Sequence, residues 1–169
     1  MSYRAAPWLC GMLAAAIGLG LPAAHSAAPV PGYALLGKPA PDFALPSQAG
    51  KNIRLSEHLG DVIVISFWST HCPPCWSQLE SLDHSLQTYH AAGVQMYGVD
   101  VDGEGPGHTS FALSVLIDRE RLVSRSYEID NLPMTVLIDR SGNIRYVHRG
   151  FTSRSEALYL QQLRSLLDE

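Results

Sequence analysis

Two cysteines separated by two residues constrain this chain more than any other feature. Cys72 and Cys75 lie between an apolar run at residues 62–65 and a segment with helical periodicity. Such a pair at a strand-to-helix junction is typical of a dithiol that opens and closes. Because a disulfide closing so small a loop constrains little of the unfolded chain, we expect redox chemistry rather than a structural crosslink.

The first residues carry the pattern of an export signal. Arg4 precedes an uncharged apolar stretch at residues 8–24, and small residues follow where a signal peptidase would cut. We therefore expect a signal peptide at residues 1–26, with an uncleaved membrane anchor as the alternative. Residues 27–37, rich in Pro and Gly, should be a flexible lead-in, and residues 38–169 should form the folded domain.

Composition and charge indicate a globular domain and exclude nucleic-acid binding. The 169 residues are 46% hydrophobic, which suits one globular domain. The net charge is −4 and the basic residues are dispersed, so we expect no nucleic-acid partner. A loose cluster of Arg119, Arg121 and Arg125 is interpreted as a solvated helix face.

Signal cleavage would remove Cys10 and leave Cys72 and Cys75 as the only cysteines. A single closely spaced pair in an exported protein favours redox activity. We expect a monomer.

Strand and helix patterns alternate along the domain. Residues 39–55 predict a hairpin, and Ser56 is expected to cap a single helical turn ending at Gly60. The continuous apolar run at 61–67 predicts a central strand. From Pro73 an amphipathic helix of about five turns should run to Gly93. Further strands are predicted at 94–101, 113–117, 134–138 and 144–147, a short helix at 119–129, and a final helix behind a capping box at 153–156. This order predicts an α/β sandwich with a mixed sheet.

Three motifs resemble one protein family. They are Pro41-Asp42-Phe43, the stretch Phe67-Trp68-Ser69-Thr70-His71-Cys72-Pro73-Pro74-Cys75, and residues 132–142 with Leu132-Pro133-Met134-Thr135 at their start. From Gly37 onward the chain resembles the exported TlpA/ResA/DsbE-like thiol–disulfide oxidoreductases of the thioredoxin-like superfamily. The resemblance implies a thioredoxin-like three-layer sandwich with a central mixed sheet and an N-terminal β-hairpin extension.

The chain departs from this family at specific positions. His71 stands where the family commonly has Trp, Gln78 where many members have Glu, and Ser66 where ordinary thioredoxins bury an acid. Residues 102–112 are too short and too rich in Gly and Pro for the helix that the family inserts. Either that crossover is reduced to a loop, or residues 113–117 pair differently.

The chemistry expected of the pair is thiol–disulfide exchange. Cys72, at the helix N-terminus, should be the nucleophile, because the helix dipole stabilises its thiolate and lowers its pKa. Cys75 should resolve the mixed disulfide. Pro73 and Pro74 suit the first helical turn, but they remove amides that could donate to the thiolate, so we expect a reducing dithiol. Protonated His71 would have the opposite effect, because its positive charge would favour the Cys72 thiolate.

Further site residues are expected around the dithiol. The resemblance implies that Pro133 is a cis-proline opposite the cysteines, with the backbone of Leu132 exposed to pair with an extended substrate. The alternative is an ordinary trans proline at a strand start. Trp68 and Trp76 flank the site and either bind substrate on an apolar rim or pack in the core. His71, Pro73, Pro74 and Gln78 are expected to modulate the dithiol.

The resemblance implies a periplasmic enzyme without cofactor. It would reduce disulfides of exported proteins, such as apocytochrome c during cytochrome c biogenesis or metal-site cysteines, with electrons from a membrane thiol–disulfide donor. A copper metallochaperone is the alternative, with His71, Cys72 and Cys75 as ligands and His108 or His148 as a partner. A peroxiredoxin-like peroxidase fits less well, because Thr70 stands two residues before Cys72, not three as in Thr-x-x-Cys.

Overall fold

The structure, a computed structural model, describes residues 32–107, 109–152 and 154–169. The expected signal peptide and residues 27–31 of the expected lead-in lie outside the described residues. Within the described ranges, no helix is both long and apolar enough to span a bilayer.

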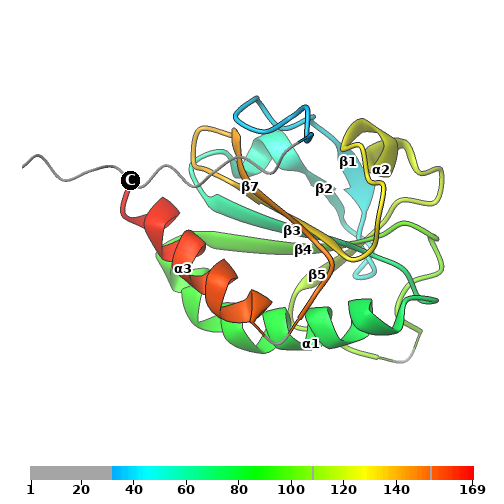
Figure 1. The fold of residues 1–169 in the computed structure, drawn as a ribbon. Coiled ribbons are helices and arrows are strands. Elements are labelled where there is room, and N and C mark those ends of the chain that lie inside the picture. The colour runs from blue at the N-terminus through cyan, green and yellow to red at the C-terminus, as the bar shows by residue number, and fades with distance from the viewer. Residues whose placement is uncertain (1–31, 108, 153) are drawn as a thin grey trace, which may run out of the picture.

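A five-stranded mixed sheet forms the centre of the domain (Figure 1). Its order is β5-β4-β3-β6-β7, in which β3, β4 and β5 run parallel and β6 is antiparallel to both β3 and β7. The strands are β3 (Val62–Trp68), β4 (Val94–Asp100), β5 (Ser114–Ile117), β6 (Met134–Ile138) and β7 (Ile144–Arg149). The mixed sheet expected from the sequence is confirmed.

Strand β3 lies in the middle of the sheet, and all seven of its residues are buried. Successive side chains of a strand point to opposite faces, so Ile63, Ile65 and Phe67 enter one core cluster. Val62 and Val64 enter a second cluster on the other face. The continuous apolar run is therefore explained by coverage on both faces, as expected.

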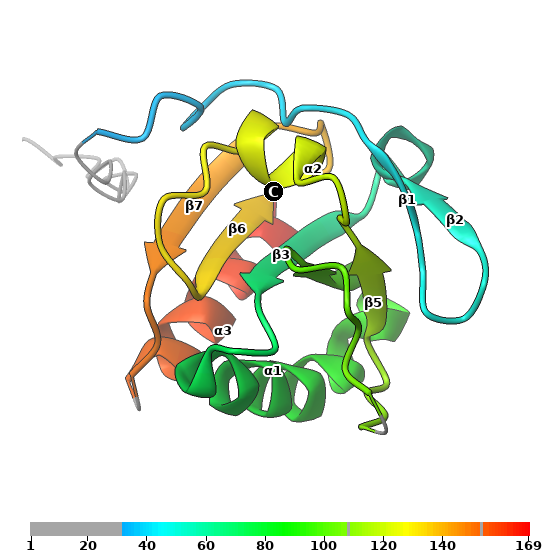
Figure 2. The same cartoon turned by 90° about the vertical axis from the view of Figure 1, so that its right-hand side faces the viewer.

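Helices and a small hairpin cover the two faces of the sheet. Helices α1 (Pro73–Leu86) and α3 (Ser155–Leu167) pack on one face, and α2 (Leu122–Ser126) lies on the other (Figures 1 and 2). The hairpin of β1 (Ala44–Pro46) and β2 (Asn52–Arg54) is antiparallel, and Ser47 bridges to Leu116 of β5. The expected three-layer sandwich with an N-terminal hairpin is confirmed.

The long helix after the cysteines is shorter than predicted. Its α-helical part ends at Leu86, and the chain continues as the 3₁₀ helix η2 (Gln87–Ala92). Gly93 then stops it in the left-handed region at φ 83°, which glycine adopts without steric cost. Leu79, Leu82 and Leu86 are buried, as the apolar spacing predicted.

Two helix starts were predicted from capping residues, and the one at Ser56 is wrong. Ser56 does not cap a turn; it lies inside the 3₁₀ helix η1 (Leu55–His58), and its amide and hydroxyl both donate to the Asp42 carboxylate. The predicted capping box rests on Ser153, which lies outside the described residues; α3 begins at Ser155 after the N-cap residue Arg154. The Glu156 carboxylate instead accepts hydrogen bonds from hydroxyls of α1, those of Ser81 and Ser85.

The helix predicted at 119–129 is reduced to the five residues of α2. Arg121 has φ 55°, in the left-handed region that a helix cannot use. The buried Asp118 carboxylate accepts the amides of Val123 and Ser124, which stand at the helix start. Helical structure therefore begins only at Leu122.

The segment between β4 and β5 decides between the two crossover alternatives. Residues 101–113, the crossover loop, contain no helix among those described, and β5 pairs parallel to β4. The crossover is thus reduced to a loop. Gly103 is required there, because a Cβ at this position would lie 2.6 Å from the Cα of Arg119. At its far end the amides of Ala112 and Leu113 donate to Asp83 of α1.

Candidate active site

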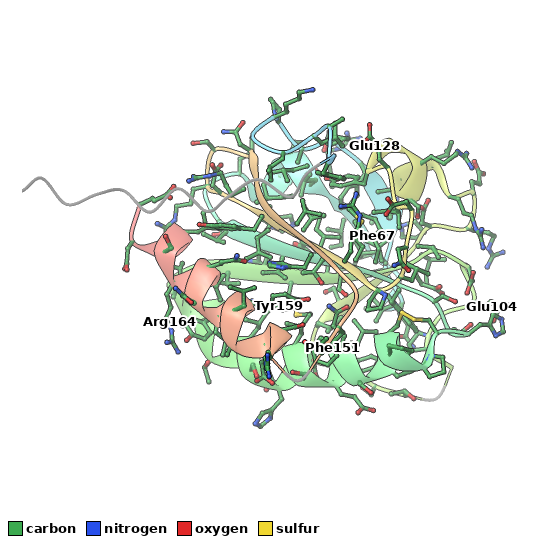
Figure 3. The ribbon with its side chains drawn as sticks, viewed as in Figure 1. Phe67, Glu104, Glu128, Phe151, Tyr159 and Arg164 are labelled. Atoms are coloured by element: carbon green, nitrogen blue, oxygen red, sulfur yellow. A yellow bond between two sulfur atoms is a disulfide. The ribbon has the colours of Figure 1, made fainter. Side chains whose placement is uncertain are left out.

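The two cysteines meet at the carboxyl end of β3. Cys72 and Cys75 form a disulfide with their Cα atoms 5.3 Å apart (Figure 3). Cys72 is the N-cap residue of α1 and is partly exposed, whereas Cys75 is fully buried. This asymmetry agrees with the predicted roles, because a sulfur must be accessible to attack a substrate.

The first turn of α1 is built by two prolines. Pro73 and Pro74 occupy the first helical positions, and both are exposed. The Cys75 amide donates to the Cys72 carbonyl at 3.0 Å, and the Cys72 amide donates to the Ser69 carbonyl at 3.2 Å. The first turn contains no acidic residue. The sulfur of Cys72 is therefore placed at the positive end of the helix dipole, with two amide donors missing.

The proline before β6 has the predicted isomer. The Leu132–Pro133 peptide bond is cis, so the alternative of a trans proline is wrong. Pro133 is buried, and its carbonyl accepts the amide of Gly150 at 2.7 Å. Leu132 is partly exposed and packs against the same cluster as Cys72. Its amide, however, donates to the side-chain oxygen of Asn131 at 2.8 Å, so a substrate strand would have to displace Asn131 to reach it.

A groove of about 660 Å³ opens beside Cys72 on the side of α2 and the segment before β6. Two of its residues, Arg121 and Arg125, belong to the cluster interpreted as a solvated helix face. Both are exposed, as that interpretation requires, but Arg121 is only the N-cap residue of α2, and both line the groove. The lining residues are Cys72, Val101, Arg121, Ser124, Arg125, Ile129, Asp130, Asn131 and Leu132.

Aromatic side chains pack in the same apolar cluster as the two cysteines. Trp68 is fully buried and meets Trp76 edge-on, with ring centroids 5.1 Å apart. Trp76 stacks on Phe111 of the crossover loop, and its indole nitrogen donates to the Thr70 carbonyl at 3.1 Å. Trp76 and Phe111 remain partly exposed. Of the two roles expected for Trp68, core packing fits its burial, and Phe111 is a contact that the sequence did not suggest.

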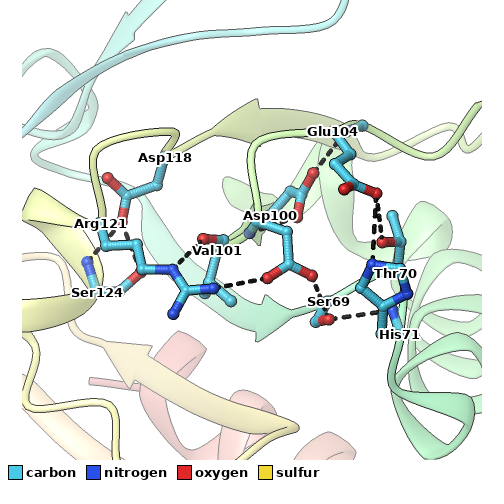
Figure 4. Close-up of polar contacts among 11 residues, drawn as sticks. Ser69, Thr70, His71, Asp100, Val101, Glu104, Asp118, Arg121 and Ser124 are labelled. Carbon is cyan, nitrogen blue, oxygen red and sulfur yellow. Dashed lines mark hydrogen bonds and ion pairs between the residues drawn. The ribbon is translucent and has the colours of Figure 1, made fainter.

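The crossover loop holds the residues that precede Cys72 (Figure 4). The Ser69 hydroxyl donates to the Asp102 carboxylate and accepts the amide of His71 at 3.1 Å. Arg121 secures Asp102 from the other side, with 2.9 Å between its Nη2 and Oδ1 of Asp102. We call these contacts, together with those of Glu104, the clasp.

Glu104 forms the outer part of the clasp. Its carboxylate accepts the Thr70 hydroxyl at 3.0 Å, and the Nε2 atom of His71 lies 3.6 Å away. The His71 side chain is 76% exposed. Ring and carboxylate thus meet at the surface (Figure 4), which places the imidazole beside Glu104.

A buried network of neutral side chains lies below the disulfide. The amide oxygen of Gln78 accepts the Ser66 hydroxyl at 2.9 Å. Its amide nitrogen donates to the hydroxyl oxygens of Thr135 at 2.8 Å and Tyr159 at 3.1 Å. All four side chains are buried, and burial raises the pKa of Tyr159 above its ordinary value. We call this group the Gln78 network; it contains no carboxylate.

His148 adjoins the Gln78 network from β7. Its ring packs on Tyr159, with centroids 4.4 Å apart, and its Nε2 lies 2.6 Å from the side-chain oxygen of Gln162. Burial lowers the pKa of His148. The other suggested metal partner, His108, lies outside the described residues. Within the described part of the chain, no group of three or more His, Cys, Asp or Glu residues is placed to hold a metal ion.

Comparisons with known proteins agree with this geometry. A family model described as the AhpC/TSA family matches residues 36–147. The thiol–disulfide oxidoreductase ResA of Bacillus subtilis is 30% identical over 125 residues, covering 70% of each chain. The ResA of Geobacillus kaustophilus is 29% identical over 127 residues, covering 72% of this chain and 73% of that protein.

Solved structures show the same relationship. A crystal structure from Chlorobium tepidum, described as a thiol:disulfide interchange protein DsbE, has a TM-score of 0.73 and 29% identity, covering 78% of this chain and 97% of the other. A peroxiredoxin Q from Xanthomonas campestris has a TM-score of 0.65 at 19% identity, which supports only the shared fold. Since the family match spans well over half of the residues, the chain belongs to the AhpC/TSA family, and it is a homologue of the ResA and DsbE thiol–disulfide oxidoreductases.

Proposed function

We propose that this protein reduces disulfides of exported proteins in the periplasm through the Cys72–Cys75 dithiol. The observation that carries the proposal is the unequal pair itself: a partly exposed Cys72 at a helix N-terminus, bonded to a fully buried Cys75 and bordered by an open groove. The homologous ResA and DsbE proteins support the reaction class, and the N-terminal pattern supports export.

The reaction is a two-step exchange. In the reduced protein, the Cys72 thiolate attacks one sulfur of a substrate disulfide; that bond breaks, and the other substrate sulfur leaves as a thiolate that takes a proton from water. Cys75 then loses its proton to water and attacks the Cys72 sulfur as a thiolate, which releases the first substrate sulfur as a thiolate and closes the Cys72–Cys75 disulfide. The substrate gains the two electrons that the protein dithiol loses. A membrane thiol–disulfide donor would then reduce the protein again.

Neighbouring residues have separate roles in this proposal. Pro133 and Leu132 form the wall against which an extended substrate segment lies, and Trp76 supplies an apolar rim on the other side. Pro73 and Pro74 withhold amide donors from the thiolate, which favours a reducing dithiol. The neutral Gln78 network offers no carboxylate for proton transfer, so we assign this transfer to water at the open groove.

Trapping of the substrate tests the proposal. A Cys75→Ser variant should accumulate mixed disulfides through Cys72 when it is expressed with its signal in the producing cells, and mass spectrometry of these adducts would identify the substrate. Apocytochrome c and the apoproteins of metal sites are the classes expected. The Cys72→Ser/Cys75→Ser double variant is the control and should form none.

A redox titration tests the direction of the reaction. The potential of the pair should lie well below that of strong periplasmic oxidants, which is about −120 mV. A value near that potential, or a Cys75→Ser variant that traps no protein, would contradict the proposed reductase.

A further inference from the structure

We infer that the groove beside Cys72 selects disulfides that have an acidic side chain close to the attacked cysteine, with Arg125 as the specificity-determining residue. The inference rests on the proposed function and adds the class of substrate sequence that this active site prefers. The charged groups around the groove differ in whether they already have partners within the protein, and this difference carries the inference.

The carboxylates around the groove are engaged within the protein. Asp130 accepts the Nε of Arg149 at 3.0 Å, and this hydrogen bond lowers the pKa of Asp130. Asp102 is bound by Ser69 and Arg121. The two carboxylates beneath, those of Asp100 and Asp118, are buried and accept backbone amides, as the bonds to Asp102, Gly105, Val123 and Ser124 show. A substrate side chain in the groove would therefore meet carboxylates that already have donors.

The two arginines of the groove differ in whether their guanidinium groups already have partners within the protein. Arg121 uses Nη2 on Asp102 and Nε on the Val101 carbonyl. Arg125 is exposed, and in the described part of the chain it forms no ion pair with a carboxylate. Its guanidinium thus keeps its donors available in a groove that Cys72 also lines. A planar guanidinium pairs with a carboxylate through two parallel hydrogen bonds.

The rest of the lining is suited to an extended peptide. Val101, Ile129 and Leu132 are apolar and line the same groove as Cys72 and the arginines. A segment whose cysteine sulfur meets Cys72 would rest on these side chains and place a neighbouring residue at Arg125. A glutamate or aspartate there gains an ion pair, and a lysine meets a like charge. The buried Asp100 and Asp118 weaken this preference without contacting the segment.

The test uses short peptides that carry one cysteine as a mixed disulfide with thiopyridine, an uncharged leaving group. Cys72 of the reduced protein attacks the peptide sulfur, the bond to thiopyridine breaks, and the released thiopyridone is followed by its absorbance. Cys75 then displaces the peptide as a thiol and closes the protein disulfide. Three sets of peptides differ only in having Glu, Gln or Lys at one position within three residues of the cysteine, on either side.

At low salt, the Glu peptide should react about threefold faster than the Gln peptide at the best position, and the Lys peptide about threefold slower, because exposed ion pairs are weak. Added salt should reduce both differences. Arg125→Glu should reverse the order, so that the Lys peptide reacts fastest, while Arg125→Gln should remove the preference. Lys38→Glu makes the same change in charge at the opposite end of the sheet and should keep the wild-type order.

The outcomes separate the two proposals. If no peptide releases thiopyridone in a reaction that needs Cys72, the proposed function fails. If all peptides react through Cys72 but Arg125→Glu keeps the wild-type order, or if Lys38→Glu reverses it equally well, the inference about the groove is overturned while the oxidoreductase activity stands. Circular dichroism on each variant confirms that the fold is retained.

Discussion

The clasp above the disulfide and the Gln78 network below it hold the same active-site segment by different means. The outer part of the clasp joins the Glu104 carboxylate to the Thr70 hydroxyl and the His71 ring at the surface, where the side chains of His71 and Glu104 are 76% and 59% exposed. The network consists of neutral groups, and its side chains are buried. A charged group keeps its hydration at the surface and loses it when buried. A carboxylate is therefore tolerated in the outer clasp, whereas the buried network is built from neutral groups.

This difference predicts unequal consequences for stability. A buried polar group left without a partner costs more than the average hydrogen bond contributes, whereas an exposed ion pair contributes little. Damage to the network should therefore lower the free energy of unfolding, and damage to the outer clasp should barely change it. Three predictions test this comparison.

The largest effect should follow Gln78→Leu. Leucine removes the shared partner of three buried hydroxyls, those of Ser66, Thr135 and Tyr159, and should lower the free energy of unfolding by about 3 kcal/mol. Urea denaturation measures it. Gln87→Leu, the same change at an exposed position of η2, should stay within about 0.5 kcal/mol of the wild type. A loss below about 1 kcal/mol for Gln78→Leu would show that the network contributes little.

A smaller effect should come from His148 as the pH falls. Burial depresses the pKa of His148 below its ordinary 6.5, so below that pH the unfolded chain binds a proton that the folded chain does not. The free energy of unfolding should therefore decrease as the pH falls from about 6.5 toward the folded-state pKa. His148→Gln should flatten this part of the profile, and His90→Gln, at an exposed position, serves as control.

If the free energy of unfolding of His148→Gln depended on pH as strongly as that of the wild type, this prediction would be contradicted. Carboxylates affect the free energy of unfolding in a separate pH range. The pKa values of Asp42 and Glu156 are lowered, chiefly by hydrogen bonds from serine, so their stabilisation is lost only at more acidic pH. The profile near pH 6 therefore reports on His148.

The smallest effect should follow Glu104→Gln. The carboxylate contacts Thr70 and His71 at the surface, so its neutralisation should change the free energy of unfolding by less than about 0.5 kcal/mol. Glu120→Gln, at another exposed position of the same region, is the matched control. A loss above about 1 kcal/mol specific to Glu104 would mean that the outer clasp stabilises the fold as strongly as a buried contact.

The parts of the site that the sequence predicted are local in the chain. The two cysteines, the prolines between them and the apolar run before them lie within one segment. The strand, the helix start and the dithiol could therefore be predicted from residues that are close in the sequence. The cis isomer of the Leu132–Pro133 bond is local as well, although the resemblance to a family was needed to expect it.

The parts that the sequence did not predict depend on positions far apart. Ser66 and Gln78 were noted separately as departures from a family, but nothing in the sequence joins them to Tyr159. The late start of α2 follows a left-handed backbone at Arg121, a conformation uncommon for arginine. A helical reading across residues 119–129 predicted that Arg125 is exposed, but not that it lines the same groove as Cys72.

The crossover loop also bears on how this domain could diversify. Its contacts to the active-site segment come from Asp102 and Glu104, and its far end is tied to Asp83, while Thr109 and Ser110 between them are exposed. Because the entropy of closing a loop grows by only about 0.6 kcal/mol for each doubling of its length, new residues inserted there would leave both anchors in place. This position could accept an appended recognition module next to the disulfide without rebuilding the chemistry.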